Sequence, residues 1–436
     1  MKVFIKNFIQ KYSILFKFIR FVPFRFRLGK EYAVHRDLIV KYEKMSFADK
    51  ELFHYEKLKE LLFFAYNNND FYHAFYKKNN YHPSQFKNIS DFKAVPIVTK
   101  NDLKEYELSY RSRFSKSSMK VNTGGTSGNS LSFYLDKDAF AREWAYMHKI
   151  WSKLGYSYLD KKISFRGKSN SGQALKYNVV HNEYVVDAYV PLSKVVAEIK
   201  VLCNKKKIRY LHGYPSSIYE FCLYLKNNGI CAQKLFNGNL KGVFLGSEYP
   251  APIYRNVIEA TLAVPTISWY GHSEMSVLAF EDENKFVYST FPTYGFTESV
   301  SDHSGNRLIC SSYYNFDSPF IRYDTGDLIC NENYEGNILN SFSISSGRVG
   351  EFILDQHGNK ISLTALIFGR HHEAFNHIKF IQVRQDKPGY ATFLIASKNQ
   401  ISLDLFDLSN VDITFDIELV EEVYKTKAGK VSLLIK

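Results

Sequence analysis

Residues 241–271 carry the sequence pattern that most constrains the fold. A short apolar run, "KGVFLG", precedes "PIYRNVIEATLA", which has the apolar spacing of a helix and a proline near its start, and a second apolar run, "PTISWYG", follows. Two buried strands joined by a helix are typical of a mostly parallel sheet. Ligands of such sheets bind at the carboxyl ends of the strands, where Ser247, Glu248, Tyr270 and Glu274 fall.

The length of the chain predicts more than one structural unit. A chain of 436 residues is too long for one compact core of ordinary size. We expect an α/β protein with a basic, aromatic N-terminal segment, residues 1–45, and a large multi-sheet domain, residues 46–347. A small, mobile α+β domain, residues 348–436, is expected to end the chain.

Three further segments have helical patterns. Residues 46–81 carry apolar side chains three and four positions apart, and Thr99 or Asn101 is suited to cap a short helix that follows. Ser217 and Glu220 have the spacing of a capping box ahead of an amphipathic helix. We therefore expect helices both before and within the parallel unit.

The composition is globular and basic. Hydrophobic residues make up 45% of the chain and charged residues 23%, and the net charge of +13 suits an anionic partner. We do not expect a nucleic acid, because the basic residues are spread over the whole chain and no nucleic-acid-binding signature occurs. The five cysteines include no C-x-x-C pair, which argues against a disulfide scaffold or a zinc knuckle and fits the cytoplasm.

The first thirty residues interleave basic and aromatic side chains. The basic ones are Lys2, Lys6, Lys11, Lys17, Arg20, Arg25, Arg27 and Lys30, and the phenylalanines among them are Phe4, Phe8, Phe16, Phe18 and Phe21. No uncharged run approaches the roughly 20 residues of a membrane span. Two alternatives stay open: a basic helix that packs on the body by its aromatic side, and an interfacial helix that touches an anionic membrane at its cytoplasmic face.

The stretch "VNTGGTSGNSLSFY", residues 121–134, is rich in glycine and hydroxyl side chains before it becomes apolar. Such a loop can turn its backbone N–H groups inward as a nest for a phosphate. It is not a Walker A loop, because no Gly-Lys-Ser/Thr follows, and it is not a dinucleotide fingerprint, because G-x-G-x-x-G is absent. Taken alone it is equally compatible with a flexible surface turn.

Five further motifs follow this loop in order. They are "GSE" at 246–248, "YGHSE" at 270–274, "RYDTGDL" at 322–328, "SGRVGE" at 346–351 and "KTKAGK" at 425–430. The ordered set resembles the adenylate-forming enzymes, which include acyl-CoA synthetases, aryl-CoA ligases and peptide-synthetase adenylation domains. Within them the chain is most similar to the branch of phenylacetate-CoA ligases and CapK-like proteins of capsule and O-antigen pathways, with "VPIVTKNDL" and "GYPSSIYEF" as supporting segments.

The resemblance implies a role for each motif around ATP. The phosphate loop would consist of Gly125, Thr126, Ser127 and Gly128, although Ser130 and Leu131 stand where the family usually has proline and lysine. The other implied nucleotide-binding residues are Ser247, Glu248, Tyr270, Gly271, Asp327 and Arg348. Tyr270 would stack on adenine, and the two carboxylate oxygens of Asp327 would accept the two ribose hydroxyls.

Three residues would complete the catalytic set. Glu274 would bind Mg²⁺, Arg348 would contact the nucleotide, and Lys430 would steady the substrate carboxylate and the α-phosphate. Gly350 stands at the family's hinge position, and glycine absorbs large φ/ψ changes at little steric cost. The implied cofactors are ATP and Mg²⁺, with coenzyme A as a co-substrate.

The implied reaction activates a small-molecule carboxylic acid as an acyl-adenylate, usually followed by transfer to coenzyme A. Transfer to an amine or hydroxyl of a sugar or amino acid, and a non-catalytic nucleotide-binding relative, stay as alternatives. Candidate residues for the acid pocket are Trp144, His148, Tyr214 and Arg166, and Arg166 together with Arg142 indicates a polar or acidic substrate.

Overall fold

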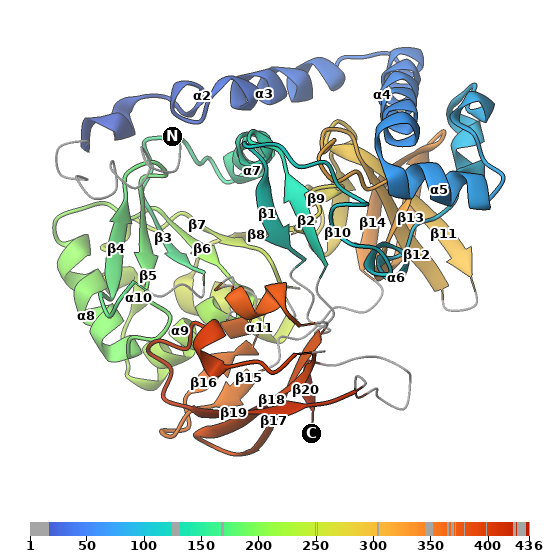
Figure 1. The fold of residues 1–436 in the computed structure, drawn as a ribbon. Helices are drawn as coiled ribbons and strands as arrows, with labels where there is room; N and C mark the ends of the chain where they lie inside the picture. Colours follow the sequence, from blue (N-terminus) through green and yellow to red (C-terminus); the bar gives the residue numbers. More distant parts are fainter. Residues whose placement is uncertain are drawn as a thin grey trace.

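The structure is a computed structural model that describes most of the chain. The described residues are 17–123, 131–166, 170–248, 250, 252–302, 305–344, 352–363, 366–367, 370, 372–378, 380–397, 399–421, 424 and 433–435. Their strands form one large sheet, a separate four-stranded sheet and two two-stranded sheets. Figure 1 shows the large sheet across the molecule and the four-stranded sheet below it, near the C-terminus.

In the described part, twelve strands make up the large sheet, in the order β11-β12-β13-β14-β10-β9-β8-β7-β6-β3-β5-β4. Their bounds are β3 (Lys162–Phe165), β4 (Leu175–Asn178), β5 (Glu183–Val186), β6 (Tyr210–Gly213), β7 (Gly242–Leu245), β8 (Thr266–Gly271), β9 (Leu278–Glu281), β10 (Val287–Thr290), β11 (Gly295–Asp302), β12 (Gly305–Ser312), β13 (Tyr323–Glu335) and β14 (Ile338–Ile344). Strands β5, β3, β6, β7 and β8 pair in parallel, and the other pairs are antiparallel. The sheet is therefore mixed, with a parallel half.

The predicted strand–helix–strand unit is confirmed. It consists of β7, α11 (Pro252–Leu262) and β8, and Val243 pairs in parallel with Thr266. The other helices that pack on this half are α8 (Leu192–Cys203), α9 (Pro215–Asn227) and α10 (Ala232–Leu235). Every residue of β3, β6 and β7 is buried, as expected for parallel strands that are covered on both faces.

The predicted capping box at Ser217 is wrong. Helix α9 begins two residues earlier, with Pro215 as its first residue, and no side chain caps it. Proline suits this first position because its fixed φ matches the helix and the N–H it lacks would have no helical partner there. Glu220 consequently lies inside the helix rather than at its first turn.

The predicted helices over residues 46–81 are confirmed as α4 (Phe47–Asn68) and α5 (Asp70–Lys78). Ser46 caps α4 by accepting a hydrogen bond from a backbone N–H in its first turn. Of the two predicted caps for the next helix, α6 (Lys100–Lys104), Thr99 is the one found, and it forms a full capping box with the third helical residue. These side chains satisfy N–H groups that have no partner within the helix.

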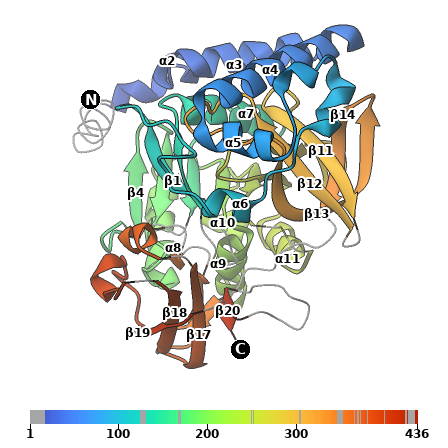
Figure 2. The same cartoon turned by 45° about the vertical axis from the view of Figure 1, so that its right-hand side comes forward.

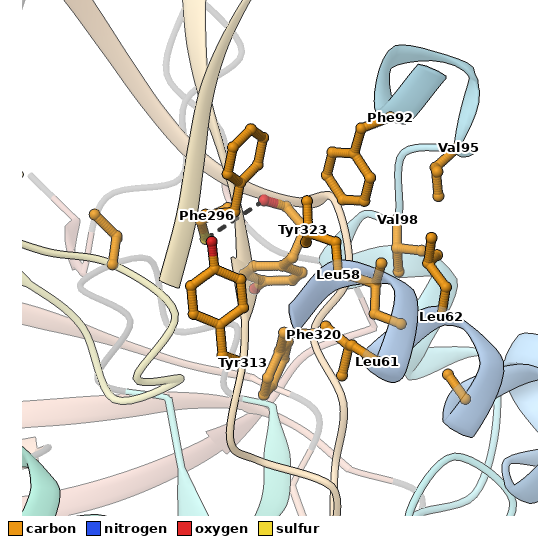
Figure 3. Packing of buried hydrophobic residues seen from close by; sticks show 14 of the residues in the cluster. Leu58, Leu61, Leu62, Phe92, Val95, Val98, Phe296, Tyr313, Phe320 and Tyr323 are labelled. Carbon is orange, nitrogen blue, oxygen red and sulfur yellow. Dashed lines mark hydrogen bonds between the residues drawn. The ribbon is translucent and has the colours of Figure 1, made fainter. Parts of the chain in front are cut away.

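The core around α4 joins the N-terminal helices to the antiparallel half of the sheet. Figure 3 shows Leu58, Leu61 and Leu62 of α4 packed with Phe296 and Tyr323 of the sheet. The remaining elements of this region are η2 (Pro83–Gln85), η3 (Ile89–Ala94), and the antiparallel pair β1 (Met119–Asn122) and β2 (Ser132–Leu135). The helices thus fix the position of the β1–β2 pair, which carries the predicted phosphate loop at its tip.

The described N-terminal segment runs along one side of the molecule, away from the four-stranded sheet in Figures 1 and 2. Its elements are η1 (Lys17–Phe21), α2 (Phe24–Arg27) and α3 (Lys30–Tyr42), and α3 lies against α7 (Ala139–Ser152). Phe24, Tyr32 and Ile39 are buried in a core shared with α7, whereas Phe26 is 70% exposed. The aromatic side of this segment is therefore only partly buried.

The C-terminal strands have a hydrophobic core of their own. They are the pair β15 (Phe352–Leu354) and β16 (Lys360–Ser362), and the sheet β19-β18-β17-β20, made of β17 (Phe380–Lys387), β18 (Tyr390–Ala396), β19 (Thr414–Leu419) and β20 (Leu434–Ile435), with the short helices η5 (Glu373–Asn376) and η6 (Leu403–Leu405) beside them. The predicted domain boundary at residue 348 lies outside the described residues and stays a prediction. In the described part of the chain, no helix has both the length and the apolar character to cross a membrane.

Candidate active site

A cavity of about 720 Å³ lies at the carboxyl ends of the parallel strands. Residues at or just beyond the ends of β3, β6, β7 and β8 line it, together with parts of α7 and β13. The predicted site residues on its wall are Trp144, Arg166, Tyr214, Ser247, Gly271, Glu274 and Asp327. A cavity of this size is in the range of small-molecule sites.

Ser247 stands at the end of β7 with a φ of +69°. This left-handed conformation is unfavourable for a residue with a Cβ, and strained backbone of this kind concentrates at functional sites. Ser247 lines the cavity and Glu248, which follows it, is not among the lining residues. Of the two, the structure brings only Ser247 to the wall.

Tyr270 and Asp327, predicted from separate motifs, are in direct contact. The Tyr270 hydroxyl donates to Oδ2 of Asp327 over 2.7 Å. Burial, together with the charge of Asp327, raises the pKa of Tyr270 well above its usual range, so the hydroxyl stays protonated and remains a donor. The hydrogen bond fixes the carboxylate of Asp327 at the cavity wall.

Glu274 is a buried carboxylate at the same wall, with 5% of its surface exposed. Its Oε1 accepts from the Tyr323 hydroxyl over 3.2 Å, and its Oε2 lies 3.2 Å from Nδ1 of His272. Burial opposes ionisation, but the charge and hydrogen bond of His272 outweigh it and lower the pKa of Glu274 to about 2. Glu274 is therefore ionised at neutral pH.

An ionised carboxylate facing a cavity is a suitable ligand for Mg²⁺, which prefers oxygen donors. Within the described ranges, no group of three or more histidines, cysteines, aspartates or glutamates could hold a metal ion. A magnesium ion would therefore bind here through Glu274 together with phosphate oxygens and water. That is a common arrangement for Mg²⁺, since it gives up its waters reluctantly.

The cavity wall also has an aromatic component. All three tryptophans of the chain, Trp144, Trp151 and Trp269, line it. The Trp269 ring lies so close to Gly246 that a Cβ at this position would be 2.0 Å from its ring carbon Cζ2. Glycine is required at position 246 for this reason, and the indole of Trp269 forms part of the pocket wall.

Two residues that the sequence suggested for the acid pocket are engaged elsewhere. His148 does not line this cavity: its ring stacks on Phe24, with centroids 4.0 Å apart, and its Nδ1 is 3.0 Å from the Tyr32 hydroxyl. Arg142 forms an ion pair with Asp136. Trp144, Tyr214 and Arg166 do lie at the cavity.

Known proteins resemble this chain in sequence and in fold. No family model matches the chain. The protein CapK of Staphylococcus aureus is 24% identical over 286 residues, which is 64% of this chain and 62% of CapK, so the match spans less than two thirds of that relative. A crystal structure of 2-hydroxyisobutyryl-CoA ligase in the postadenylation state, in complex with 2-HIB-AMP, has a TM-score of 0.54 over 90% of each chain at 16% identity.

This chain has the adenylate-forming fold. The same ligase in complex with 2-HIB-AMP and CoA, in its thioesterification state, has a TM-score of 0.53 over 90% of each chain at 16% identity. The resemblance that the ordered motifs predicted is confirmed by the fold and by the CapK relative.

Several predicted residues of the adenylate-forming motifs lie outside the described residues. They are Gly125, Thr126, Ser127 and Gly128 of the loop, together with Arg348, Gly350 and Lys430. The described flanks of the loop are informative: Thr123 lines the cavity, and Val121 pairs with Phe133 across the β1–β2 pair. Leu131, at the position where the family usually has lysine, is buried in the core with 1% exposed.

Lys100 is a cavity residue to which the sequence analysis gave no role. It is the first residue of α6 and lines the cavity, and its charge is one of the influences that lower the pKa of Glu274. The signal was available in "VPIVTKNDL", where the lysine directly follows the capping threonine. A second unpredicted residue is His212 at the end of β6.

Glu220 of α9 gives the fold a testable pH dependence. Burial and the nearby charge of Glu248 outweigh the charge of Lys360 and raise the pKa of Glu220 to about 8 from a usual 4.5. Between these values the unfolded chain has released the proton that the folded chain keeps, so the free energy of unfolding falls as the pH rises through this window.

We expect Glu220→Gln to remove this pH-dependent fall in the free energy of unfolding. Thermal unfolding should show the variant more stable than the wild-type protein at about pH 9, with the difference shrinking toward about pH 5. Equal differences at the two pH values would mean that Glu220 ionises normally in the folded protein.

Proposed function

We propose that this chain is an AMP-forming acid ligase. It activates a carboxylic acid with ATP, releasing pyrophosphate, and passes the acyl group of the acyl-adenylate to coenzyme A. The observation that carries this proposal is one cavity in an adenylate-forming fold that holds Glu274 and the Tyr270–Asp327 pair at one part of its wall and three tryptophans at another.

The nucleotide occupies the part of the cavity near β13. Asp327, held by Tyr270, accepts the ribose hydroxyls, and the loop of Gly125 to Gly128 wraps the phosphates with backbone N–H groups and hydroxyls. Ser247 and Gly271 border the adenine. A magnesium ion bound at Glu274 supplies positive charge to the phosphates.

The chemical step joins the acid's carboxylate oxygen to the α-phosphorus as pyrophosphate leaves. These two anions repel one another, so this chain must act by positioning them and by placing cations where charge accumulates. Lys430 and Arg348 are the cations we assign to this task. Residues 348–436 carry Lys430 and rotate about Gly350 after adenylation to admit the acceptor.

Coenzyme A is the first candidate for the acceptor. The solved 2-hydroxyisobutyryl-CoA ligase is in complex with CoA, which supports a thiol acceptor. An amine or hydroxyl of a sugar or amino acid is the second candidate, in line with the resemblance of the motifs to CapK-like proteins of capsule and O-antigen pathways. A non-catalytic nucleotide-binding role would leave Glu274 and Lys430 without a task.

A hydroxylamine-trapping screen tests the proposal. Hydroxylamine intercepts acyl-adenylates, so the protein with ATP and Mg²⁺ should yield a hydroxamate with at least one acid among phenylacetate, hydroxy acids, amino acids and uronic acids. Repeating each positive reaction with coenzyme A in place of hydroxylamine identifies the acceptor. Failure with all classes, despite nucleotide binding, would favour the non-catalytic alternative.

We also propose that the N-terminal segment contacts an anionic membrane surface. Phe18, Phe21 and Phe26 are 62%, 59% and 70% exposed, and Arg20 and Arg25 lie over the rings of Phe21 and Phe26. Exposed aromatic rings beside guanidinium groups suit the interface of anionic lipids.

Replacing these three phenylalanines by alanine should weaken flotation with anionic vesicles at least about tenfold, because each ring loses apolar area worth roughly 1 kcal/mol or more on insertion. Phe114→Ala removes a ring that is 65% exposed elsewhere and should leave flotation unchanged. Equal flotation of the triple variant and the wild-type protein would rule out this contact.

A further inference from the structure

Arg166 is a charged residue of the cavity wall that has no ion-pair partner in the described part of the chain. It directly follows β3, is partly buried, and lines the cavity together with Tyr214 and His212. Among the residues that the structure describes, none offers it a carboxylate at ion-pair distance. Arg255 and Arg322, which are also buried, each pair with a glutamate.

One buried carboxylate on which the charge of Arg166 acts, Glu183, is already engaged. Glu183 lies 3.2 Å from Nζ of Lys162, and both side chains are almost fully buried. It also accepts from Oγ of Ser164 over 2.7 Å and from Nδ2 of Asn178 over 3.0 Å. Glu183 therefore neutralises Lys162 and leaves the charge of Arg166 directed at the cavity.

Two polar neighbours of this region on the cavity wall, His212 and Trp151, carry no negative charge. Burial, reinforced by the charges of Arg166 and Lys162, lowers the pKa of His212 well below its usual range, so His212 is neutral. The indole N–H of Trp151 is buried with no acceptor in the described part of the chain. This end of the cavity thus offers donors and positive charge.

We propose that Arg166 binds a second anionic group of the acid, so that the substrates of this site are acids with two anionic groups, most simply dicarboxylic acids. This inference rests on the proposed function, which supplies the first carboxylate. The tryptophans exclude water around the pair, which makes a guanidinium–carboxylate contact stronger than it is in water. When Arg166 binds the second anionic group of the acid, the reacting carboxylate at the other end of the acid is held toward the nucleotide.

The test compares matched acids that differ only in the second anion: hexanoate with adipate, and 4-methylbenzoate with terephthalate. A phosphorylated hydroxy acid beside its free hydroxy acid distinguishes a phosphate from a carboxylate as the second anion. Both kcat/KM for hydroxamate formation and the dissociation constant from calorimetry are measured. Arg209→Met is the matched control, because Arg209 pairs with Asp160 before β6 and is 38% exposed.

We expect the wild-type protein and Arg209→Met to prefer the doubly charged acid, and Arg166→Met to lose about 10- to 100-fold of that preference. Arg166→Lys should recover part of it. An unchanged preference in Arg166→Met, or a uniform loss with all acids and with ATP, would overturn the assignment. The dissociation constants from calorimetry test the binding role of Arg166 even if no acid yields a hydroxamate. A lack of hydroxamate with every acid would count against the proposed function alone.

Discussion

Lys430→Ala should reduce acyl-adenylate formation by about 10² to 10³, equivalent to roughly 3 to 4 kcal/mol of transition-state stabilisation. The reason is that the proposed role of Lys430 is to provide positive charge where the substrate carboxylate meets the α-phosphate, because two anions approach each other in that step. Acid-dependent exchange of labelled pyrophosphate into ATP measures this effect. The thermal unfolding temperature is measured alongside, so that a loss of catalysis can be separated from a loss of folded protein.

Lys427→Ala is the matched control, since it removes the same charge three residues earlier in "KTKAGK". It should exchange pyrophosphate at nearly the wild-type rate. The second half-reaction, started from a supplied acyl-adenylate and coenzyme A, should be far less affected in Lys430→Ala than the first. Wild-type exchange in Lys430→Ala would refute the role assigned to this lysine.

Glu281→Ala should destabilise the fold by about 3 to 5 kcal/mol, because it removes the paired carboxylate of a buried arginine and leaves Arg255 only a 3.4 Å contact with Glu259. Arg255 is 1% exposed and Glu281 4%, and the two form paired hydrogen bonds of 2.6 and 2.9 Å. Glu281 also accepts from the backbone N–H groups of Ser268 and Phe286. These contacts tie α11 to β8 and β9, and β8 delivers Tyr270 and Gly271 to the site.

Asp282→Ala is the control for this prediction, because the neighbouring carboxylate pairs with Lys153 at the surface and both side chains are more than a third exposed. Exposed pairs of this kind contribute about 0 to 1 kcal/mol. Denaturant unfolding of the two variants measures the difference directly. A Glu281→Ala protein as stable as Asp282→Ala would show that the Arg255 network does not hold the sheet.

The parallel half of the fold could be predicted because its strands are continuous apolar runs and its crossover helix has a clear period. The capping box at Ser217 and Glu220 could not be judged correctly from spacing alone, since Pro215 two residues earlier is the stronger signal for the start of a helix. At α6 the same reasoning worked, because both partners of the Thr99 capping box are at the right spacing and no earlier start signal competes.

The candidate site, like the fold, could be predicted only in part. Glu274 and Asp327 could be found because the order of the motifs carries the resemblance, but the contact of Asp327 with Tyr270 depends on tertiary packing. The different positions of Trp144 and His148 were not predictable, because α7 is buried on most of its circumference.

The central claim is that the acid attacks the α-phosphorus of ATP in this cavity, and oxygen transfer tests it most directly. An acid from the trapping screen, labelled with ¹⁸O in its carboxylate, is incubated with the protein, ATP and coenzyme A, and the products are analysed by mass spectrometry. We predict AMP that carries one ¹⁸O atom. Unlabelled AMP, or label in inorganic phosphate together with ADP, would contradict the account.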